Sequence, residues 1–290
     1  MRLAIVGAGN VGKVLGTALA RKGYHLSAAS AQTEDTRYQV STLWDCPVFS
    51  EPYKAAAAGD VVFLTTPDQV IEKVCLEIAR QDGFHQGQVV LHTSGAHSSD
   101  ILASAKNAGA SVLAFHPLQT FPQLEVGLGA LPGTYFAVDG DEEAFPLAEK
   151  LVEALEGKLL FVPTALKPLY HAAACTACNY LVSLMDMALK MYEPMDIPPS
   201  KAMEALTPLI EGTLRNIRTL NPEKALTGPI ARGDLATIES HLENIKKYKP
   251  ELLPYYCSMG IYTAELAVRK GTLSKETEET IIAMLGGEQK

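Results

Sequence analysis

The chain begins with Arg2-Leu-Ala-Ile-Val6, continues through Gly7-Ala-Gly-Asn-Val-Gly12, and goes on with Lys13-Val-Leu-Gly-Thr-Ala-Leu-Ala-Arg-Lys22. The first segment is short, apolar and β-rich, and in the third the apolar residues recur at helical spacing. Gly23 follows as a helix C-cap, and the run His25–Ala29 restores extended character. The glycines therefore stand between a strand and the helix that follows it, which predicts a strand–turn–helix–strand unit.

Each glycine of this turn has its own physical reason. Gly7 permits a tight turn, Gly9 lets the backbone approach a pyrophosphate, and Gly12 lets the helix pack close to the strand. The free N–H groups at the start of the helix, around Asn10 and Val11, and the positive end of its dipole would bind phosphates. We therefore predict a dinucleotide-binding turn, and the alternative is a glycine-rich structural turn.

The end of the second predicted strand favours one cofactor. An acidic residue about 20 positions beyond the glycines would bind the ribose 2′-hydroxyl of NAD. Here that position holds Ser30, and the first carboxylates, Glu34-Asp35, are expected in a loop. A 2′-phosphate would meet no repulsion and could accept hydrogen bonds from Ser30, Gln32 and Thr33, with Arg37 as a charge partner. We predict NADP rather than NAD, although Ser30 could simply end a strand.

Strand-like apolar runs recur through the first half of the chain with helices or turns between them. This alternation implies βα units and a mostly parallel sheet. We predict an α/β domain of the Rossmann type, doubly wound, over residues 1–163. The runs are 60–65, 88–92, 111–115, 134–138 and 158–162.

Ligands of such sheets bind beyond the carboxyl ends of the strands, so the residues that follow each run are informative. Thr66-Pro67 follows one run as a candidate cofactor contact, and the next residue, Asp68, would either cap a helix or contact a ribose. Ser94 follows another run and could donate a hydrogen bond to a substrate carbonyl or to the nicotinamide carboxamide. His116, directly before a proline, is expected to line the pocket.

Three histidines of this half could be imagined as a metal cluster. His92, His97 and His116 have no acidic companion, and their spacing matches no zinc pattern. We predict no metal site.

From residue 164 onward the pattern is helical, which predicts an all-α domain over 164–290. Pro168 fits the first turn of a central helix that runs on through 172–192, with Lys167 at its entrance. His171 and Asn179 share one stripe of this helix, which either leans against a cofactor pocket or is buried with its polar groups satisfied. Further helices are predicted over 200–220, 234–247, 250–270 and 274–285.

The loop Thr227-Gly-Pro-Ile-Ala-Arg-Gly-Asp234 is tightly specified, and such loops usually position something. Arg232, its only cation, could clamp a substrate carboxylate. Asp234 is an N-cap candidate for the next helix, and His241 would face the same cleft or solvent. The Cys175–Cys178 CxxC lacks both a thioredoxin-like context and a second pair of zinc ligands, so we interpret it as packing residues.

Composition excludes several classes of function. The net charge of -8 and a pI of about 5.4 argue against a nucleic-acid binder with a basic surface. No secretory signal opens the chain, and five cysteines suggest reduced thiols in the cytoplasm. The long apolar stretch 172–189 contains Asn179 and Asp186, which favours a buried helix over a membrane span.

Together, the glycine turn, Thr93-Ser-Gly95, His116-Pro-Leu-Gln119, Lys167-x-x-Tyr170-His171 and the loop 227–234 resemble one family. It comprises bacterial Rossmann-like oxidoreductases with a helical C-terminal domain of unknown function, related to ketopantoate reductase, pyrroline-carboxylate reductase and the β-hydroxyacid dehydrogenases. The resemblance covers nearly the whole chain, and the loop is its most specific marker. It implies NADP-dependent reduction of a C=O or C=N bond in a small carboxylate, such as a 2-oxo acid or an imino acid. It also implies a homodimer built through the helical domains.

In the β-hydroxyacid dehydrogenases and ketopantoate reductases, a lysine at the start of the central helix and an asparagine one turn later serve the substrate. Lys167 is similar to that lysine, whereas His171 stands one turn later and Asn179 two turns beyond. We therefore expect Lys167 or His171 to supply the proton, with a preference for His171. Asn179 and Ser94 would orient the reacting atom, and Arg232 would hold the carboxylate. The alternative is a non-catalytic NADP-binding redox sensor or dimerisation module.

Overall fold

The computed structural model describes residues 1–287 and divides into two compact units that meet between Ala177 and Cys178. We predicted a domain boundary between residues 163 and 164. The boundary lies 14 residues further along the chain because the helix that starts at Lys167 packs with the first unit. Lys167 pairs with Asp139, and Tyr170 bonds His116.

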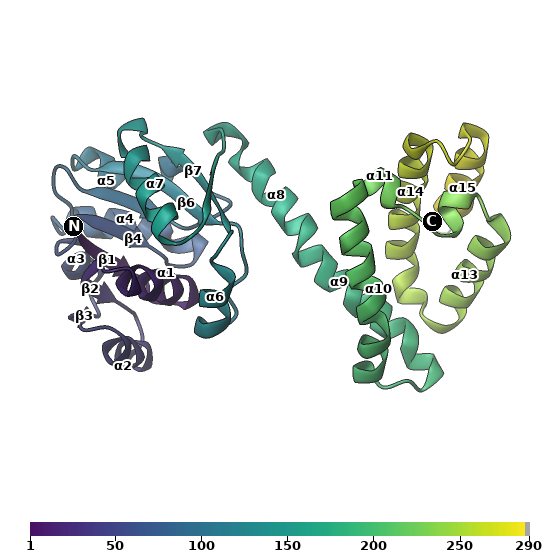
Figure 1. Ribbon diagram of the computed structural model, residues 1–290, viewed down its shortest axis with the longest axis horizontal. Helices are drawn as coiled ribbons and strands as arrows, with labels where there is room; N and C mark the ends of the chain where they lie inside the picture. The colour runs from purple at the N-terminus through teal and green to yellow at the C-terminus, as the bar shows by residue number, and fades with distance from the viewer. Residues whose placement is uncertain (288–290) are drawn as a thin grey trace. The chain divides into compact units, whose positions relative to one another are not determined.

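The first unit contains one eight-stranded sheet with the order β3-β2-β1-β4-β5-β6-β7-β8 (Figure 1). Neighbouring strands are parallel except for the antiparallel pair β6 and β7. This is the mostly parallel, Rossmann-type sheet that the alternation predicts. The strands are β1 (Arg2–Val6), β2 (His25–Ser30), β3 (Val48–Phe49), β4 (Val61–Leu64), β5 (Val89–His92), β6 (Ser111–Pro117), β7 (Tyr135–Gly140) and β8 (Lys158–Phe161).

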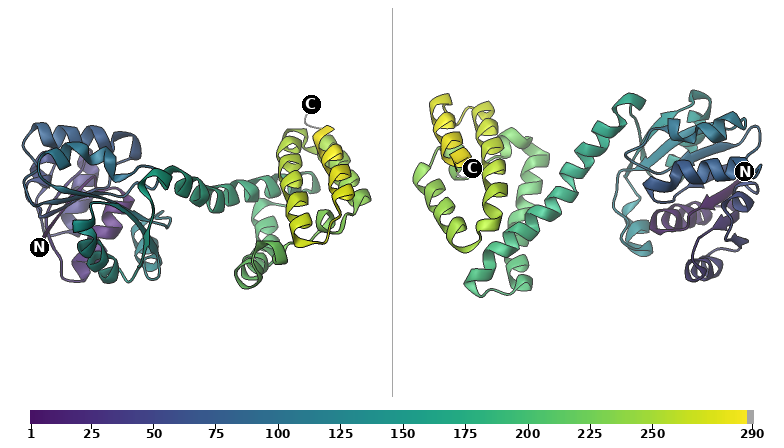
Figure 2. Two further views of the ribbon diagram at one scale, coloured as in Figure 1. Left: turned by 90° about the horizontal axis from the view of Figure 1, so that it is seen from above. Right: turned by 180° about the vertical axis from the view of Figure 1, so that it is seen from behind.

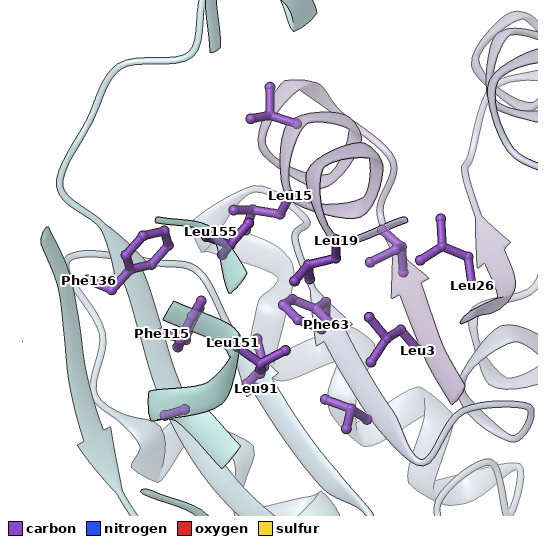
Figure 3. Close-up of a cluster of buried hydrophobic side chains, with 14 of the residues drawn as sticks. Leu3, Leu15, Leu19, Leu26, Phe63, Leu91, Phe115, Phe136, Leu151 and Leu155 are labelled. Carbon is purple, nitrogen blue, oxygen red and sulfur yellow. The ribbon is translucent and has the colours of Figure 1, made fainter. Parts of the chain in front are cut away.

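Helices cover both faces of this sheet (Figures 1 and 2). On one face α1 (Asn10–Arg21) and α7 (Phe145–Ala154) bury leucines and phenylalanines (Figure 3). On the other face lie α3 (Pro52–Ala56), α4 (Ile71–Arg80) and α5 (Ala103–Asn107). Alternate residues of β4 serve the two cores, since Phe63 joins the first and Leu64 the second. The central strands are therefore apolar throughout, as a sheet buried on both faces requires.

The remaining elements of the first unit are short. They are α2 (Glu34–Leu43), η1 (Asp68–Val70), η2 (Ser99–Leu102), α6 (Leu124–Ala130), η3 (Glu142–Ala144), η4 (Thr164–Leu166) and α8 (Lys167–Ala177). Glu34 and Asp35 form the first turn of α2 and not the loop that we predicted, because Thr33 caps this helix by accepting a hydrogen bond from the N–H of Thr36.

The second unit is helical, as predicted. It contains α9 (Asn179–Tyr192), η5 (Glu193–Met195), α10 (Pro199–Leu220), α11 (Pro222–Ala225), α12 (Pro229–Arg232), α13 (Leu235–Tyr248), η6 (Pro250–Leu252), α14 (Leu253–Lys270) and α15 (Lys275–Gly287). Its core joins α12, α13, α14 and α15. Gly271, with φ of 81°, ends α14, and Ser274 accepts the N–H of Thr277 at the start of α15.

The central helix differs from its prediction in two ways. It is interrupted at Cys178, where φ is -112° and ψ is -66°, so α8 and α9 are separate helices. Its second half, α9, is also not buried within the second unit, since Tyr180 and Val182 are 62% and 68% exposed. By length and composition alone, Thr164–Met195 could span a membrane, and a single segment of this kind is weak evidence for insertion.

Candidate functional site

The glycine turn opens a cleft of about 750 Å³ beyond the carboxyl ends of β1, β2 and β4. Of the predicted cofactor contacts, the cleft lining includes Gly7, Gly9, Asn10, Val11, Ser30, Thr66 and Pro67. Gly12 lies behind the turn, where an added Cβ would come within 2.5 Å of Thr65 Oγ1 and 2.8 Å of the Gly7 oxygen. Gly12 therefore allows the close packing of helix against strand that we predicted, without lining the cleft.

Backbone geometry makes the turn a phosphate cradle. Gly7 has φ of +93°, which favours glycine, and its N–H bonds the oxygen of Ser30. An added Cβ at Gly9 would meet nothing within 4 Å, so the space above this residue is open to a ligand. The first N–H groups of α1 have no partner inside the helix, and Gly9 is its N-cap. The arrangement suits a diphosphate.

A buried polar atom of the same cleft has no partner. The hydroxyl of Thr66 is the one buried side-chain oxygen or nitrogen without a hydrogen bond among the described residues. Buried hydroxyls are normally paired, so this one has the chemistry of a ligand contact. Together with the cradle, it shows that the cleft fits a dinucleotide.

The far end of the cleft presents hydroxyls and amides. Ser30 is buried there and carries no charge, and Gln32 and Thr33 join it in the lining. Arg37 donates to the carbonyl oxygens of Ala31 and Gln32, which holds its guanidinium against this loop. The lining residues that directly follow β2 are therefore uncharged and include no carboxylate of the kind that binds a ribose 2′-hydroxyl.

Asp68 also lines the cleft. It is the first residue of η1, whose N-cap is Pro67, and the N-cap of the following α4 is Val70. Of the two roles that we considered for Asp68, the structure does not support capping.

A second group of polar side chains gathers where β5 and β6 end. His116 Nδ1 and the Tyr170 hydroxyl are 2.9 Å apart, and the rings meet edge to face. An added Cβ at Gly95 would come within 2.7 Å of both His116 Nε2 and His171 Cδ2. The absent side chain of Gly95 therefore lets two imidazoles lie over this peptide. His171 also contacts the Cys175 sulfur at 3.8 Å.

Burial keeps His116 and Tyr170 uncharged. Desolvation, with a smaller contribution from the nearby Lys167 charge, lowers the pKa of His116 to about 3. Desolvation raises the pKa of Tyr170 to about 12. At neutral pH this pair is a neutral imidazole and a neutral phenol.

His92 is buried beneath this group. It accepts a hydrogen bond from the N–H of Ser94 on Nδ1, so its proton lies on Nε2 and bonds the Ser98 oxygen. Desolvation lowers its pKa to about 4. Ser94 is buried too, and its hydroxyl accepts from the N–H groups of Ala96 and His97. Ser94 therefore shapes the turn after β5 and keeps one hydroxyl hydrogen to donate.

Lys167 has an unexpected environment. Its side chain is 0% exposed, and Nζ lies 2.9 Å from Asp139 Oδ2. Burial lowers the pKa of Lys167, and the Asp139 carboxylate opposes that shift. A side chain with no accessible surface makes no direct contact with a substrate from this position.

The other two predicted substrate contacts, Asn179 and Arg232, belong to the second unit. Asn179 is the first residue of α9, and Arg232 is an exposed cation at the end of α12. Asp234 accepts the N–H of Thr237 and caps α13, as we considered. His241 bonds the Tyr256 hydroxyl. Within residues 1–287, no three His, Cys, Asp or Glu side chains are placed to hold a metal ion.

Two polar residues of this region, Asp139 and Tyr170, were not predicted. Asp139 directly follows the predicted run 134–138, but β7 is antiparallel to β6, so the rule for the carboxyl ends of parallel strands does not explain its place. Tyr170 stands between Lys167 and His171 in a motif that we had quoted. Its pairing with His116 spans 54 residues and follows only from the topology.

Comparison with known families finds two domain families along the chain. Residues 1–117 match the Rossmann-like domain family, and residues 134–263 match DUF2520, a domain of unknown function. No curated protein matches the chain.

Solved structures share the fold over nearly the whole chain. A Bacteroides fragilis protein provisionally assigned as an NADP oxidoreductase has a TM-score of 0.74 at 19% identity, covering 91% of this chain and 98% of that one. A Thermotoga maritima protein has 0.70 at 25% identity, with coverage of 92% and 99%. Pyrroline carboxylate reductase from Plasmodium falciparum, solved with NADP, has 0.59 at 9% identity and covers 98% of both chains. Solved neighbours of this fold thus include NADP-dependent reductases.

Proposed function

We propose that this chain, in which a Rossmann-like domain precedes a DUF2520 domain, is an NADP-dependent reductase of a C=O or C=N bond in a small carboxylate. The observation that carries the proposal is a polar group at the carboxyl ends of β5 and β6, next to an open dinucleotide cradle. Thr93 lines the same cleft as the cradle, and the next residues, Ser94 and Gly95, adjoin the His116 and His171 side chains. This is where an α/β sheet binds its ligands.

The cradle would hold the diphosphate of NADP on the N–H groups that follow Gly9, and the Thr66 hydroxyl would bond the same cofactor. The 2′-phosphate would lie among Ser30, Gln32 and Thr33, close to the Arg37 guanidinium. When bound, the nicotinamide supplies the hydride, and the chain supplies orientation and protons.

His116 would orient the bond that is reduced. Because the pKa of Tyr170 is raised and that of His116 is lowered, both groups are neutral, and in our proposal the phenol donates its hydrogen to Nδ1. The imidazole proton then lies on Nε2, the atom nearest Gly95. A neutral Nε2–H donor stabilises negative charge on a substrate oxygen as it develops.

His171 would deliver the proton. It is half-buried beside Gly95 and His116, and an imidazole transfers protons near neutral pH. Lys167, our other candidate, is buried against Asp139. Arg232 and Asn179 remain the proposed partners of the substrate carboxylate and of the reacting atom.

We also propose that the protein is a homodimer in the cytoplasm. The support is the number of large apolar side chains that one chain leaves exposed on its second unit. Tyr180, Val182, Leu209, Leu214 and Ile217 are all at least 40% exposed. Monomeric proteins rarely leave such side chains uncovered in one region.

The test is a pair of measurements on the purified chain. Titration calorimetry with NADPH and with NADH should give heat, with the tighter affinity for NADPH. With a panel of 2-oxo acids and cyclic imino acids, the oxidation of NADPH should then appear as a loss of absorbance at 340 nm. Substitution of His171 by Gln should lower kcat by roughly 10²-fold, whereas His85→Gln, at an exposed histidine outside the cleft, should leave it unchanged.

The outcomes separate the alternatives. Heat with NADPH but no oxidation across the whole panel would favour the non-catalytic sensor. No heat with any pyridine nucleotide, on folded protein, would refute both readings.

A further inference from the structure

A buried ion pair joins three segments of the first unit. Asp139 lies on β7, and its two oxygens have different partners. Oδ1 accepts the N–H of Ser99, at the start of η2, at 2.9 Å. Oδ2 accepts from Nζ of Lys167, the first residue of α8, also at 2.9 Å. One carboxylate therefore holds both the segment after β5 and the helix that carries Tyr170 and His171.

The segment between Ser94 and Ser99 is held from its other side by His92. The imidazole accepts from the Ser94 N–H and donates to the Ser98 oxygen. The neutral His92 side chain therefore bonds the segment at Ser94 and Ser98, and the charged Asp139 side chain bonds it at Ser99. It includes Gly95, over which the imidazoles of His116 and His171 lie.

The same pair sets the start of α8. Residues three and four positions apart share one face of a helix, so Lys167, Tyr170 and His171 lie on one side of the first turn. Nζ of Lys167 lies 5.8 Å from the centre of the Tyr170 ring. A shift of the Lys167 side chain would therefore move both rings relative to His116.

We propose that Lys167 is a positioning residue, which through Asp139 fixes the Tyr170 hydroxyl on His116 and the His171 ring over Gly95. This inference rests on the proposed function, because it assigns these rings to the reaction. Lys167 does not transfer the proton itself, since no surface of its side chain is accessible.

The choice of a charged pair has a physical rationale. Two buried charges seldom stabilise a fold more than apolar side chains of the same volume would. An ammonium and a carboxylate, however, impose a direction that apolar packing lacks. Asp139 also satisfies the buried N–H of Ser99, which an apolar residue would leave unpaired.

Two substitutions of Lys167 separate positioning from proton transfer. Lys167→Met removes the ammonium and should lower kcat by roughly 10- to 100-fold, because misplacement of reacting groups by about 1 Å costs that much. Lys167→Arg keeps a donor for Asp139 but cannot release a proton near neutral pH. A positioning residue predicts that Arg restores most of kcat, whereas a proton donor predicts that Arg and Met are equally impaired.

The kinetics are measured with NADPH and the best acceptor of the panel described above. The KM for NADPH should stay within about twofold, since the cradle lies on β1 and α1. The pH-dependent limb of kcat should persist in Lys167→Met, because the proposed proton donor, His171, is still present. Disappearance of that pH limb, or no rescue by a folded Arg variant, would overturn the proposal.

A spectroscopic measurement covers the case in which Arg does not fit the buried site. In ¹⁵N-histidine-labelled protein, long-range ¹H–¹⁵N spectra report the tautomer of each imidazole. Asp139→Asn keeps an oxygen for the Ser99 N–H but loses the ionic partner of Lys167. It should disturb the His116 and His171 signals and leave exposed His85 unchanged. Unchanged His116 and His171 signals in this variant would equally contradict the proposal.

Failure of this inference is distinguishable from failure of the proposed function. Wild-type protein that neither binds nor oxidises NADPH removes the proposed reaction. Wild-type protein that turns over, with Lys167→Met as fast as wild type, removes only the positioning role.

Discussion

At the scale of single residues, Gly9 and Gly12 of the same turn are required for different reasons. Gly12 has no room for a Cβ because Thr65 and the Gly7 oxygen lie too close. Gly9 has room in the protein, and its φ of -73° suits any residue. What glycine provides at position 9 is therefore space for a ligand, and at position 12 it is space for the fold.

This difference predicts opposite effects of two matched substitutions. Gly9→Ala should lower NADPH affinity about tenfold or more, equivalent to about 1.4 kcal/mol, and leave the Tm unchanged. Gly12→Ala should lower the free energy of unfolding by about 1–3 kcal/mol through overpacking. Calorimetry with NADPH and thermal unfolding followed by circular dichroism measure the two effects. A Gly9→Ala variant that binds as wild type does would show that no diphosphate approaches this position.

At the scale of elements, the segment between β5 and η2 depends on an uncharged His92. Its pKa is about 4 in the folded chain, below the ordinary 6.5, because burial disfavours the imidazolium. The unfolded chain therefore binds a proton at a higher pH than the folded chain does. The contribution of His92 to stability is complete above about pH 6.5 and is lost as the pH falls toward 4.

We expect the free energy of unfolding to fall between pH 7 and pH 5, with about 2 kcal/mol of the loss due to His92. His92→Gln, whose amide can still donate to the Ser98 oxygen, should remove that part of the pH dependence. His85→Gln, at an exposed position, should not. Urea unfolding at pH 7, 6 and 5 gives the free energy of unfolding of the wild type and of both variants. Equal pH dependence in wild type and His92→Gln would contradict the role of His92.

At the scale of the whole molecule, the second unit leaves an apolar surface uncovered. On α10, Leu209 and Leu214 are 66% and 50% exposed, and only Ala202 of this helix is buried. A second copy of the chain that covers these side chains would remove the apolar surface from water.

The expected mass by light scattering is about 62 kDa, twice the 31.2 kDa of one chain. Leu209→Glu combined with Leu214→Glu should shift the protein toward the monomer, because each places a charge in the proposed interface. Leu76→Glu, on α4 of the first unit and 38% exposed, is the control. A wild-type monomer at micromolar concentration would refute the dimer.

Much of the fold was predictable because its signals are local. The run 2–6 forms β1 as predicted, and the helix ends at Asp234 and Gly271 follow from local caps. The interruption at Cys178 was not predictable, because no proline or glycine marks it. The exposure of α9 was also missed, since an apolar sequence does not tell whether its own chain covers it.

The site divides in the same way. The cofactor turn could be predicted because Gly7, Gly9 and Gly12 lie within six residues and each meets a local steric requirement. The polar group could be predicted only in part, because His116 meets Tyr170 across 54 residues and Lys167 meets Asp139 across 28. The strand, the turn and the helix of the predicted phosphate site follow from neighbours along the chain, so the amino-acid order suffices to predict them. The burial of Lys167 and the contact of Tyr170 with His116 follow only from the folded arrangement, because strand order and helix placement bring distant residues together.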